Sequence, residues 1–210
     1  MFEFKFVSPK WIQHGDINLA GDITLQQAKI ILEMHSGDIY QYLLNENILH
    51  FGLVSVYSGA LKIFTDPVSS YPILLRMGGN GKKTSVTDNI EGLKSQTSSR
   101  NTVALKSILN AGYCLGTDTI IQDVKWISPF SCVTVKENGL LEKNYFKGLT
   151  ASKKLTYFEI EENLVDICRK KISCQVSLPL SAGYDSKFLA RLLKNSNRSI
   201  NAFSYGPKQA

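Results

Sequence analysis

Apolar and polar side chains alternate over about the first 90 residues, which predicts mainly antiparallel β-structure. Phe2, Phe4 and Phe6 are separated by charged residues, so this stretch is expected to form a strand with one aromatic face buried. The alternation continues through residues 11–23, where Gly-Asp pairs at 15–16 and 21–22 interrupt it as the turns of hairpins would.

Two further hairpins are indicated by turn residues that separate apolar stretches. Residues 50–57 and 60–64 flank Ser58-Gly59, which is a two-residue turn signal. Residues 71–77 and 83–87 flank a Gly-Gly-Asn-Gly sequence. The pattern therefore predicts an antiparallel β domain at the start of the chain.

Helical patterns occur at two places in this first part. Thr24 and Gln27 have the spacing of a capping box, but the following residues 28–35 fit a short helix and a strand equally well. Residues 103–109 have apolar side chains at helical spacing, and Gly112 is placed to end that helix.

The pattern changes after a short polar stretch, residues 147–156, which is expected to be a linker. Thr156 and Glu159 have the spacing of a second capping box, which predicts a helix. One face of that helix carries the apolar residues Ile160, Leu164, Ile167 and Cys168.

A strand, a helix and a second strand are expected to follow. The first strand covers residues 176–180, the helix 187–194 and the last strand 200–205. The helix residues expected to face the sheet are Phe188, Leu189 and Leu192. This order predicts an α/β arrangement in which a ligand binds at the carboxyl end of the first strand.

Composition and charge narrow the classes of function. No apolar stretch approaches the ~20 residues that span a bilayer, and the N-terminus lacks a signal peptide's apolar core, so a cytoplasmic protein with no membrane partner is expected. The net charge of +6 would suit a polyanion, but the Lys and Arg residues are scattered, so nucleic acid is not the expected partner. The four cysteines and three histidines have no metal-site spacing.

The sequence SAGYDS, residues 181–186, lies between the predicted strand and helix and has the chemistry of a phosphate-binding turn. Backbone N–H groups at a helix start lack helical acceptors, and the helix dipole adds partial positive charge there. Ser181 and Ser186 add hydroxyl donors, Gly183 allows close approach of the backbone, and Asp185 would hold Mg²⁺. The alternative is an ordinary turn in which serine and glycine only cap the helix.

This turn resembles the SGGxDS pyrophosphate loop of the N-type ATP pyrophosphatases, the PP-loop superfamily that includes the asparagine synthetases. The resemblance implies AMP-forming chemistry: a substrate oxygen attacks the α-phosphate of ATP, pyrophosphate leaves into the loop, and an amine then displaces AMP. The residues that it implies for binding the pyrophosphate and its Mg²⁺ are Ser181, Gly183, Asp185 and Ser186, with Leu180 near the adenosine. Ala182 departs from the family pattern, which usually has glycine there, and its methyl group fits without strain if φ is negative.

The first part of the chain resembles the asparagine synthetase family independently of the loop. A D-x-x-G-x-x-P segment occurs in the family's glutamine amidotransferase domain, and residues 66–74 have the Asp and Pro in register, with Ser69 at the glycine position. Residues 111–146 resemble the connector that follows in the family. The matching positions there are Gly112, Thr119, Ile120, Val124, Pro129 and Tyr145-Phe146.

The resemblance implies a two-part fold. Residues 1–146 are expected to form an α+β domain with antiparallel strands, similar to a degenerate Ntn amidotransferase domain, together with its connector. After the linker, residues 157–210 are expected to form the N-terminal part of an α/β parallel-sheet domain of the HUP, or PP-loop, type. This second domain is expected to be incomplete, so that the chain is either truncated or completed by a second chain.

The expected function is that of an asparagine-synthetase-like, AMP-forming amide ligase that uses ATP and Mg²⁺. Amidotransferases of this class use a cysteine directly after the initiator methionine, and because Phe2 stands there, glutamine hydrolysis is not expected. Ammonia and a carboxylate substrate, aspartate-like or a sugar acid, are the expected small-molecule partners. No catalytic side chain is assigned, and whether the isolated chain turns over stays open.

Two alternatives to this function stay open as well. The chain would be a non-catalytic binding or assembly module that retains the loop and the β domain, either as a remnant or as half of a split synthetase. It would be a tRNA-modifying enzyme of the same superfamily if RNA binding accompanied the loop, although no basic patch with aromatics is visible.

Overall fold

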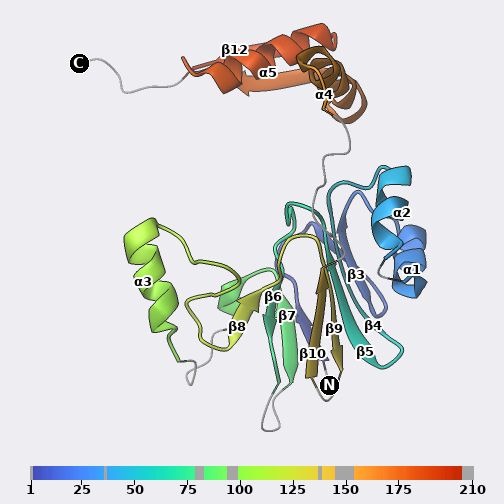
Figure 1. Cartoon of the computed structure of the whole chain (residues 1–210), viewed down its shortest axis with the longest axis vertical. Helices are drawn as coiled ribbons and strands as arrows, with labels where there is room; N and C mark the ends of the chain where they lie inside the picture. Colours follow the sequence, from blue (N-terminus) through green and yellow to red (C-terminus); the bar gives the residue numbers. More distant parts are fainter. Residues whose placement is uncertain are drawn as a thin grey trace. The chain divides into compact units, whose positions relative to one another are not determined.

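The computed structural model of the chain describes residues 2–35, 37–78, 83–93, 99–136, 139–144 and 154–204. The chain divides into two compact units, Met1–Leu149 and Thr150–Ala210. Each unit has a hydrophobic core of its own, and Figure 1 shows the elements of each. The described part of the chain has no helix that is both long and apolar enough to cross a membrane.

A six-stranded antiparallel sheet forms the largest part of the first unit. Its strand order is β10-β9-β5-β4-β3-β2. The strands are β2 (Trp11–His14), β3 (Ile17–Gly21), β4 (Phe51–Tyr57), β5 (Ala60–Thr65), β9 (Ser131–Lys136) and β10 (Gly139–Asn144). The predicted turns at 15–16 and 58–59 are confirmed, since β2 pairs with β3 and β4 pairs with β5. The second Gly-Asp pair is not a hairpin turn, because it leads from β3 into a helix.

A second, four-stranded sheet has the order β1-β7-β6-β8. Its strands are β1 (Phe2–Lys5), β6 (Leu74–Arg76), β7 (Thr84–Thr87) and β8 (Val124–Trp126). β6 and β7 pair as predicted, although the tip of their turn, residues 79–82, lies outside the described residues. β1 differs from the antiparallel prediction, because it pairs with β7 in parallel. The carboxylate of Asp88, just after β7, accepts hydrogen bonds from the amides of Val7 and Ser8 and so holds the end of β1 beside β7.

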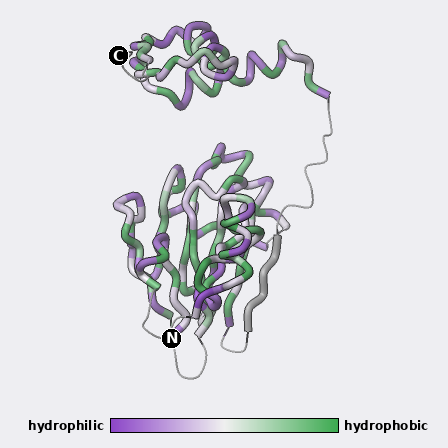
Figure 2. The backbone as a smooth tube through the Cα atoms, turned by 90° about the vertical axis from the view of Figure 1, so that its left-hand side faces the viewer, coloured by the Kyte–Doolittle hydropathy of each residue, from purple (hydrophilic) through white to green (hydrophobic). Residues whose placement is uncertain are grey.

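The two sheets pack face to face around a shared core. Val54 and Ile63 of the six-stranded sheet and Ile73 and Val86 from the other side of the core are all fully buried. The alternating aromatic residues of β1 pack against this core, as the sequence pattern predicts. Figure 2 shows how hydrophobic residues are concentrated along the strands of the first unit.

Helices α1 (Leu25–Glu33) and α2 (Ile39–Asn45) contribute to a second core with the six-stranded sheet. α1 settles the alternative left open by the sequence: Thr24 and Gln27 form the capping box, and Ala28, Ile31 and Leu32 are buried. α2 has no counterpart in the sequence analysis, although its two buried residues, Ile39 and Leu43, are four apart. The helix predicted at 103–109 is confirmed as α3 (Thr102–Ala111), which precedes β8 in the sequence and ends at Gly112 with φ of 83°.

The second unit contains the predicted order of helix, strand, helix and strand. These elements are α4 (Tyr157–Lys171), β11 (Gln175–Pro179), α5 (Tyr184–Asn195) and β12 (Ser199–Phe203). β11 and β12 pair in parallel, so the strand–helix–strand prediction is confirmed. The capping box of Thr156 and Glu159 is present at the start of α4.

The buried faces of the two helices differ from the prediction in detail. Ile160 and Ile167 of α4 are 42% and 46% exposed, and Leu189 of α5 is 39% exposed. Val165 and Leu193 are buried instead. The reason is that α4 and α5 pack against each other and against a sheet of only two described strands. Each helix therefore buries a narrower face than a helix on a wide sheet would.

Candidate phosphate-binding turn and the adjoining helix groove

The turn between β11 and α5 brings the predicted site residues together at the carboxyl ends of both parallel strands. The amide of Leu180 donates a hydrogen bond of 2.7 Å to the carbonyl of Phe203, the last residue of β12. Leu180 therefore lies where both strands end. In open parallel sheets this edge is where ligands bind.

Hydrogen bonds between the two serines close the turn. The hydroxyl oxygens of Ser181 and Ser186 are 3.0 Å apart, and the Ser181 amide donates to the Ser186 hydroxyl at 3.2 Å. The Gly183 amide donates to the Ser181 hydroxyl at 3.1 Å. Both predicted hydroxyls thus lie at one place, although they are five residues apart in the sequence.

The backbone of the turn is free of left-handed residues. Gly183 has φ of −67° and ψ of 156°, which any residue adopts. Its lack of a side chain matters for space, because a Cβ there would come within 3.1 Å of the Ser181 hydroxyl oxygen. Ala182 is not among the residues with positive φ, so its methyl group does not strain the turn.

The turn opens onto the uncapped N-terminus of α5. The helix starts at Tyr184, three residues earlier than predicted, and its N-cap Gly183 makes no side-chain capping hydrogen bond. The amides of residues 184–186 therefore have no helical acceptor, and the dipole of a 12-residue helix adds partial positive charge. Asp185 lies in this first turn and is exposed.

Tyr184 and Lys187 form a contact beside the turn that the sequence analysis did not predict. The Tyr184 side chain is 91% exposed, and the Lys187 ammonium lies over its ring, 5.9 Å from the centroid. This is a cation–π geometry one helical turn apart. In the described structure the Lys187 ammonium is therefore associated with an aromatic face of the same helix.

The donor set of the turn fits a phosphate with one Mg²⁺. Within the described residues no group of three His, Cys, Asp or Glu side chains comes together as a metal site. Mg²⁺ commonly binds through one or two carboxylates, with phosphate oxygens and water completing its shell, so Asp185 alone is a sufficient protein ligand. The amides and hydroxyls of the turn match the acceptor oxygens of a phosphate.

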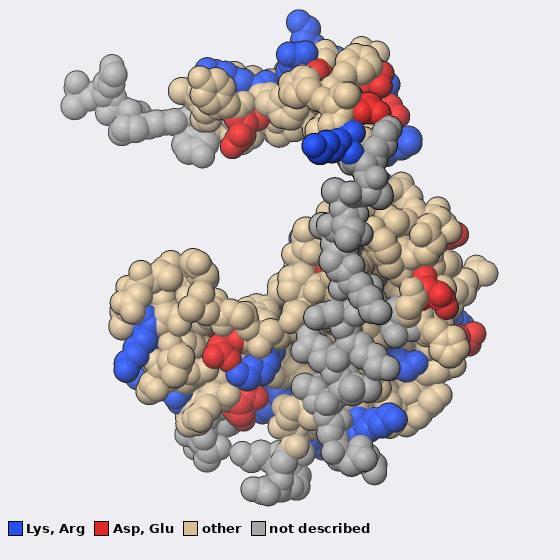
Figure 3. Space-filling view, viewed as in Figure 1, with Lys and Arg blue, Asp and Glu red and all other residues tan. Residues whose placement is uncertain are grey.

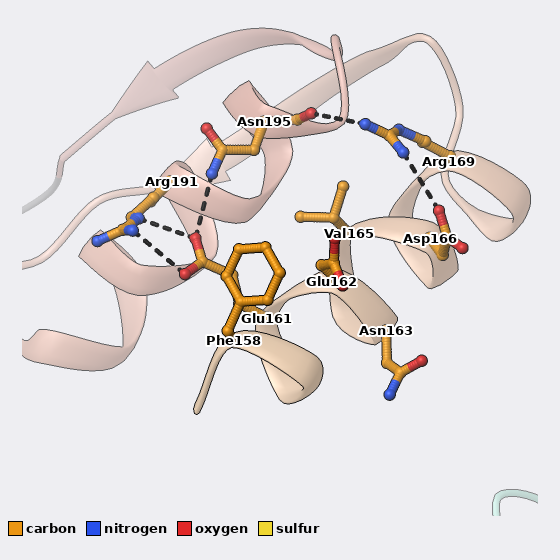
Figure 4. Close-up of a pocket in the computed structure, with 9 residues that line it drawn as sticks. All are labelled: Phe158, Glu161, Glu162, Asn163, Val165, Asp166, Arg169, Arg191 and Asn195. Atoms are coloured by element: carbon orange, nitrogen blue, oxygen red, sulfur yellow. Dashed lines mark hydrogen bonds and ion pairs between the residues drawn. The ribbon is translucent and has the colours of Figure 1, made fainter. Parts of the chain in front are cut away.

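A groove of about 570 Å³ lies between α4 and α5, and none of residues 180–186 lines it. Figure 4 shows that Glu161 of α4 reaches Arg191 of α5 through two hydrogen bonds, at 3.0 and 3.2 Å. Asn195 donates a third bond to the same carboxylate at 3.2 Å. The Glu161 side chain is only 12% exposed, so its charge is matched at the point where the two helices meet.

One signal in the sequence would have identified this groove. Glu161 precedes Val165 by four residues and Cys168 by seven, so it lies on the face of α4 that carries the buried residues. A carboxylate on a buried face requires a partner. Arg191 is one of three cations on the next predicted helix, the others being Lys187 and Lys194.

Asp66 in the first unit lies within the segment that resembles the amidotransferase pattern. Its side chain is fully buried and accepts hydrogen bonds from the amides of Phe51 at 3.0 Å and Val68 at 2.8 Å. The Ser70 amide donates to the same carboxylate. Ser69, which stands at the glycine position of the resembling pattern, has φ of 51°, a conformation that glycine adopts readily.

No protein-family model matches this chain, and no curated protein matches it either. The residues of the turn and their geometry therefore carry the functional interpretation.

Proposed function

We propose that the chain is an asparagine-synthetase-like protein that binds Mg²⁺–ATP at the turn 181–186 and uses it to form an amide. One observation carries this proposal: the turn joins the end of a parallel strand to an uncapped helix, with the Ser181 and Ser186 hydroxyls 3.0 Å apart at its base. This arrangement gathers amides, hydroxyls and a carboxylate on one short segment. Such a set suits the pyrophosphate part of ATP better than it suits a neutral ligand.

Each residue of the turn has a proposed role. The first-turn amides of α5 and the hydroxyls of Ser181 and Ser186 would donate to pyrophosphate oxygens, and Gly183 would leave room for them. Asp185 would hold the Mg²⁺ that neutralises the leaving group. Leu180, at the end of β11, would lie against the adenosine. A carboxylate oxygen of the substrate would attack the α-phosphate of ATP, and pyrophosphate would leave into the turn. An amine would then attack the acyl carbon of the resulting acyl adenylate and displace AMP.

The finer fold assignment is part of the same proposal. We infer that the first unit is a degenerate Ntn amidotransferase-like domain and the second a PP-loop domain. The first assignment is supported by the two packed sheets with helices on one outer face. It is also supported by the buried Asp66, whose turn contains Ser69 in the left-handed region. The parallel β11–α5–β12 unit supports the second.

The proposed partners follow from the amide-forming reaction and from the size of the sheet in the second unit. A carboxylate substrate, aspartate-like or a sugar acid, and ammonia would meet the activated phosphate at the carboxyl ends of the strands. In the described residues the sheet of the second unit consists of β11 and β12, and parallel sheets of so few strands are seldom stable alone. A second polypeptide that adds strands to this sheet is therefore a proposed partner.

Titration calorimetry with Mg²⁺–ATP on the purified chain tests the proposal. Wild-type protein should bind, Asp185→Ala should bind at least ten-fold more weakly, and Asp166→Ala, an exposed carboxylate on α4, should bind like wild type. Absence of binding by a wild-type chain with a folded circular dichroism spectrum would show that the turn only caps α5. Binding that both variants retain would place the nucleotide elsewhere.

A further inference from the structure

A groove in the first unit, of about 370 Å³, lies between α1, β4 and the turn that joins β2 to β3. We call it the α1 groove. Its volume is in the range of small-molecule sites. All the residues that line it belong to the first unit, so it is separate from the turn at 181–186.

The base of the α1 groove contains a buried hydroxyl group. Ser55 of β4 lines the groove and is 1% exposed, and its hydroxyl makes no hydrogen bond to any described residue. The side chain lies on the α1 side of the sheet, because Leu53, two residues earlier in the strand, packs in the core that α1 shares. A buried hydroxyl without a partner costs free energy, so a polar ligand atom in the groove would gain a hydrogen bond there.

Charged side chains of both signs border the same groove. Lys29 and Glu33 lie one helical turn apart on α1, and Asp16 lies in the turn between β2 and β3. All three are exposed, and none makes an ion pair or a side-chain hydrogen bond within the described part of the chain. Figure 3 shows charges of both signs on the surface around α1.

A neighbouring lysine, Lys62, is already engaged by the protein. Its ammonium donates a hydrogen bond of 2.7 Å to the carbonyl of Leu32, near the end of α1. It also lies over the ring of Tyr57, 4.7 Å from the centroid. Lys29 is therefore the cation that remains for a ligand in the α1 groove.

The mixture of charges indicates which class of ligand the groove suits. A simple anion would be attracted by Lys29 but repelled by Asp16 and Glu33, and a simple cation would meet the reverse. The described His, Cys, Asp and Glu side chains do not gather as a metal site. A small zwitterion, by contrast, places a charge of opposite sign beside each of these groups.

We propose that the α1 groove binds a free amino acid. The carboxylates of Asp16 and Glu33 hold its ammonium group, and the Lys29 ammonium holds its carboxylate. The Ser55 hydroxyl forms a hydrogen bond with a polar atom of the ligand, and the buried Leu32 provides an apolar wall for the aliphatic part of its side chain. The proposal is independent of the nucleotide site.

An NMR titration of the ¹⁵N-labelled full chain with each standard amino acid in turn tests the binding. At least one should give saturable shifts at the amides of residues 14–17 and 29–33. The amide of that amino acid lacks the negative charge and its N-acetyl form lacks the positive charge, so each should bind about ten-fold more weakly. The proposal is overturned if no amino acid shifts these amides, or if either derivative binds as well as its parent.

Variants of the lining residues test where the amino acid binds. Lys29→Met should raise the dissociation constant about ten-fold and Ser55→Ala about five-fold. Lys106→Met, at an exposed lysine of α3, is the matched control and should bind like wild type. Circular dichroism confirms that each variant is folded. Wild-type affinity in a folded Lys29→Met or Ser55→Ala chain would place the amino acid elsewhere, and equal weakening in the control would show a general effect of charge; both results would overturn the proposal.

Discussion

Asp66 is a buried side chain that fixes the backbone of one segment of the first unit. It is fully buried, and its two oxygens accept hydrogen bonds from three backbone amides that link the start of β4 to the segment after β5. Buried amides that lose their acceptor pay the full desolvation cost of an unmade hydrogen bond. The same segment carries Ser69 in the left-handed region, so its shape depends on this carboxylate.

Asp66→Ala is therefore expected to lower the free energy of unfolding of the first unit by about 3 kcal/mol. Urea denaturation followed by circular dichroism measures it. Asp16→Ala, an exposed carboxylate in the turn between β2 and β3, is the control and should change little. Equal stability of wild type and Asp66→Ala would contradict the role given to this side chain.

Asp118 provides a pH-dependent test at the same scale. A hydrogen bond from the Lys125 ammonium is the main cause that lowers the pKa of the Asp118 carboxyl below its ordinary value. A lowered pKa in the folded state means that the interaction is fully present above the ordinary pKa and is lost as pH falls through the folded value. Lys125→Met should raise the Asp118 pKa toward its ordinary value, as measured by NMR titration of the carboxyl carbon. An unchanged titration midpoint would show that Lys125 is not the cause.

At the scale of elements, two arginines tie the ends of α4 and α5 together. Arg198, before β12, donates to the carbonyls of Cys168 and Arg169 at the end of α4. Arg169 in turn donates to the carbonyl of Asn195 at the end of α5. The Cys168 carbonyl also accepts the amide of Ile172 at 3.2 Å, and a cation beside the last carbonyls of a helix complements the helix dipole.

Arg198→Ala should destabilise the second unit by about 1–2 kcal/mol, and Arg198→Lys should recover only part of that loss, because an ammonium lacks the planar set of donors. Hydrogen exchange of the amides of α4 measures the effect within the unit. Lys194→Ala, an exposed cation at the end of α5, is the control. Equal exchange in Arg198→Ala and wild type would contradict the capping role.

The elements differ in how well the sequence predicted them. The hairpin at Ser58-Gly59 and the helix that begins after Thr156 were predicted correctly, because their signals are local. The glycine at 21 does not form a hairpin turn, and the capping box of Thr24 and Gln27 left helix and strand open, because the same local signals occur in more than one structure. α2 was missed, since it is short and has no side-chain cap at Asp38. The parallel pairing of β1 with β7 joins residues about 80 positions apart, and no local pattern encodes it.

The candidate turn was predicted because its signal is local, a short sequence between a strand and a helix. The groove between α4 and α5 was not predicted. Ser181 and Ser186 are five residues apart, and the turn geometry alone brings their hydroxyls together. The contact between Glu161 and Arg191 joins two helices across 30 residues, so it depends on how the helices pack. Helix faces were misjudged at Ile160 and Leu189 because the extent of the sheet decides which face is buried.

At the scale of the whole molecule, the two units have separate cores and are expected to unfold separately. Leu193→Ala removes a buried side chain from the core of the second unit, and Phe51→Ala does so in the first. Each should cost about 3–5 kcal/mol within its own unit, through lost burial and a cavity. Hydrogen exchange with mass spectrometry should show faster exchange in the mutated unit and unchanged exchange in the other. Faster exchange in both units from either change would show that they fold as one.

The central claim is that residues 181–186 form a pyrophosphate-binding turn. The most direct test is an NMR titration of the ¹⁵N-labelled chain with Mg²⁺–pyrophosphate, which needs neither the acceptor substrate nor a complete reaction. Saturable shifts are expected for the amides of Ser181, Gly183 and Asp185, and they should be lost in Asp185→Ala. Shifts that are absent from this turn, or that occur only at other residues, would contradict the account.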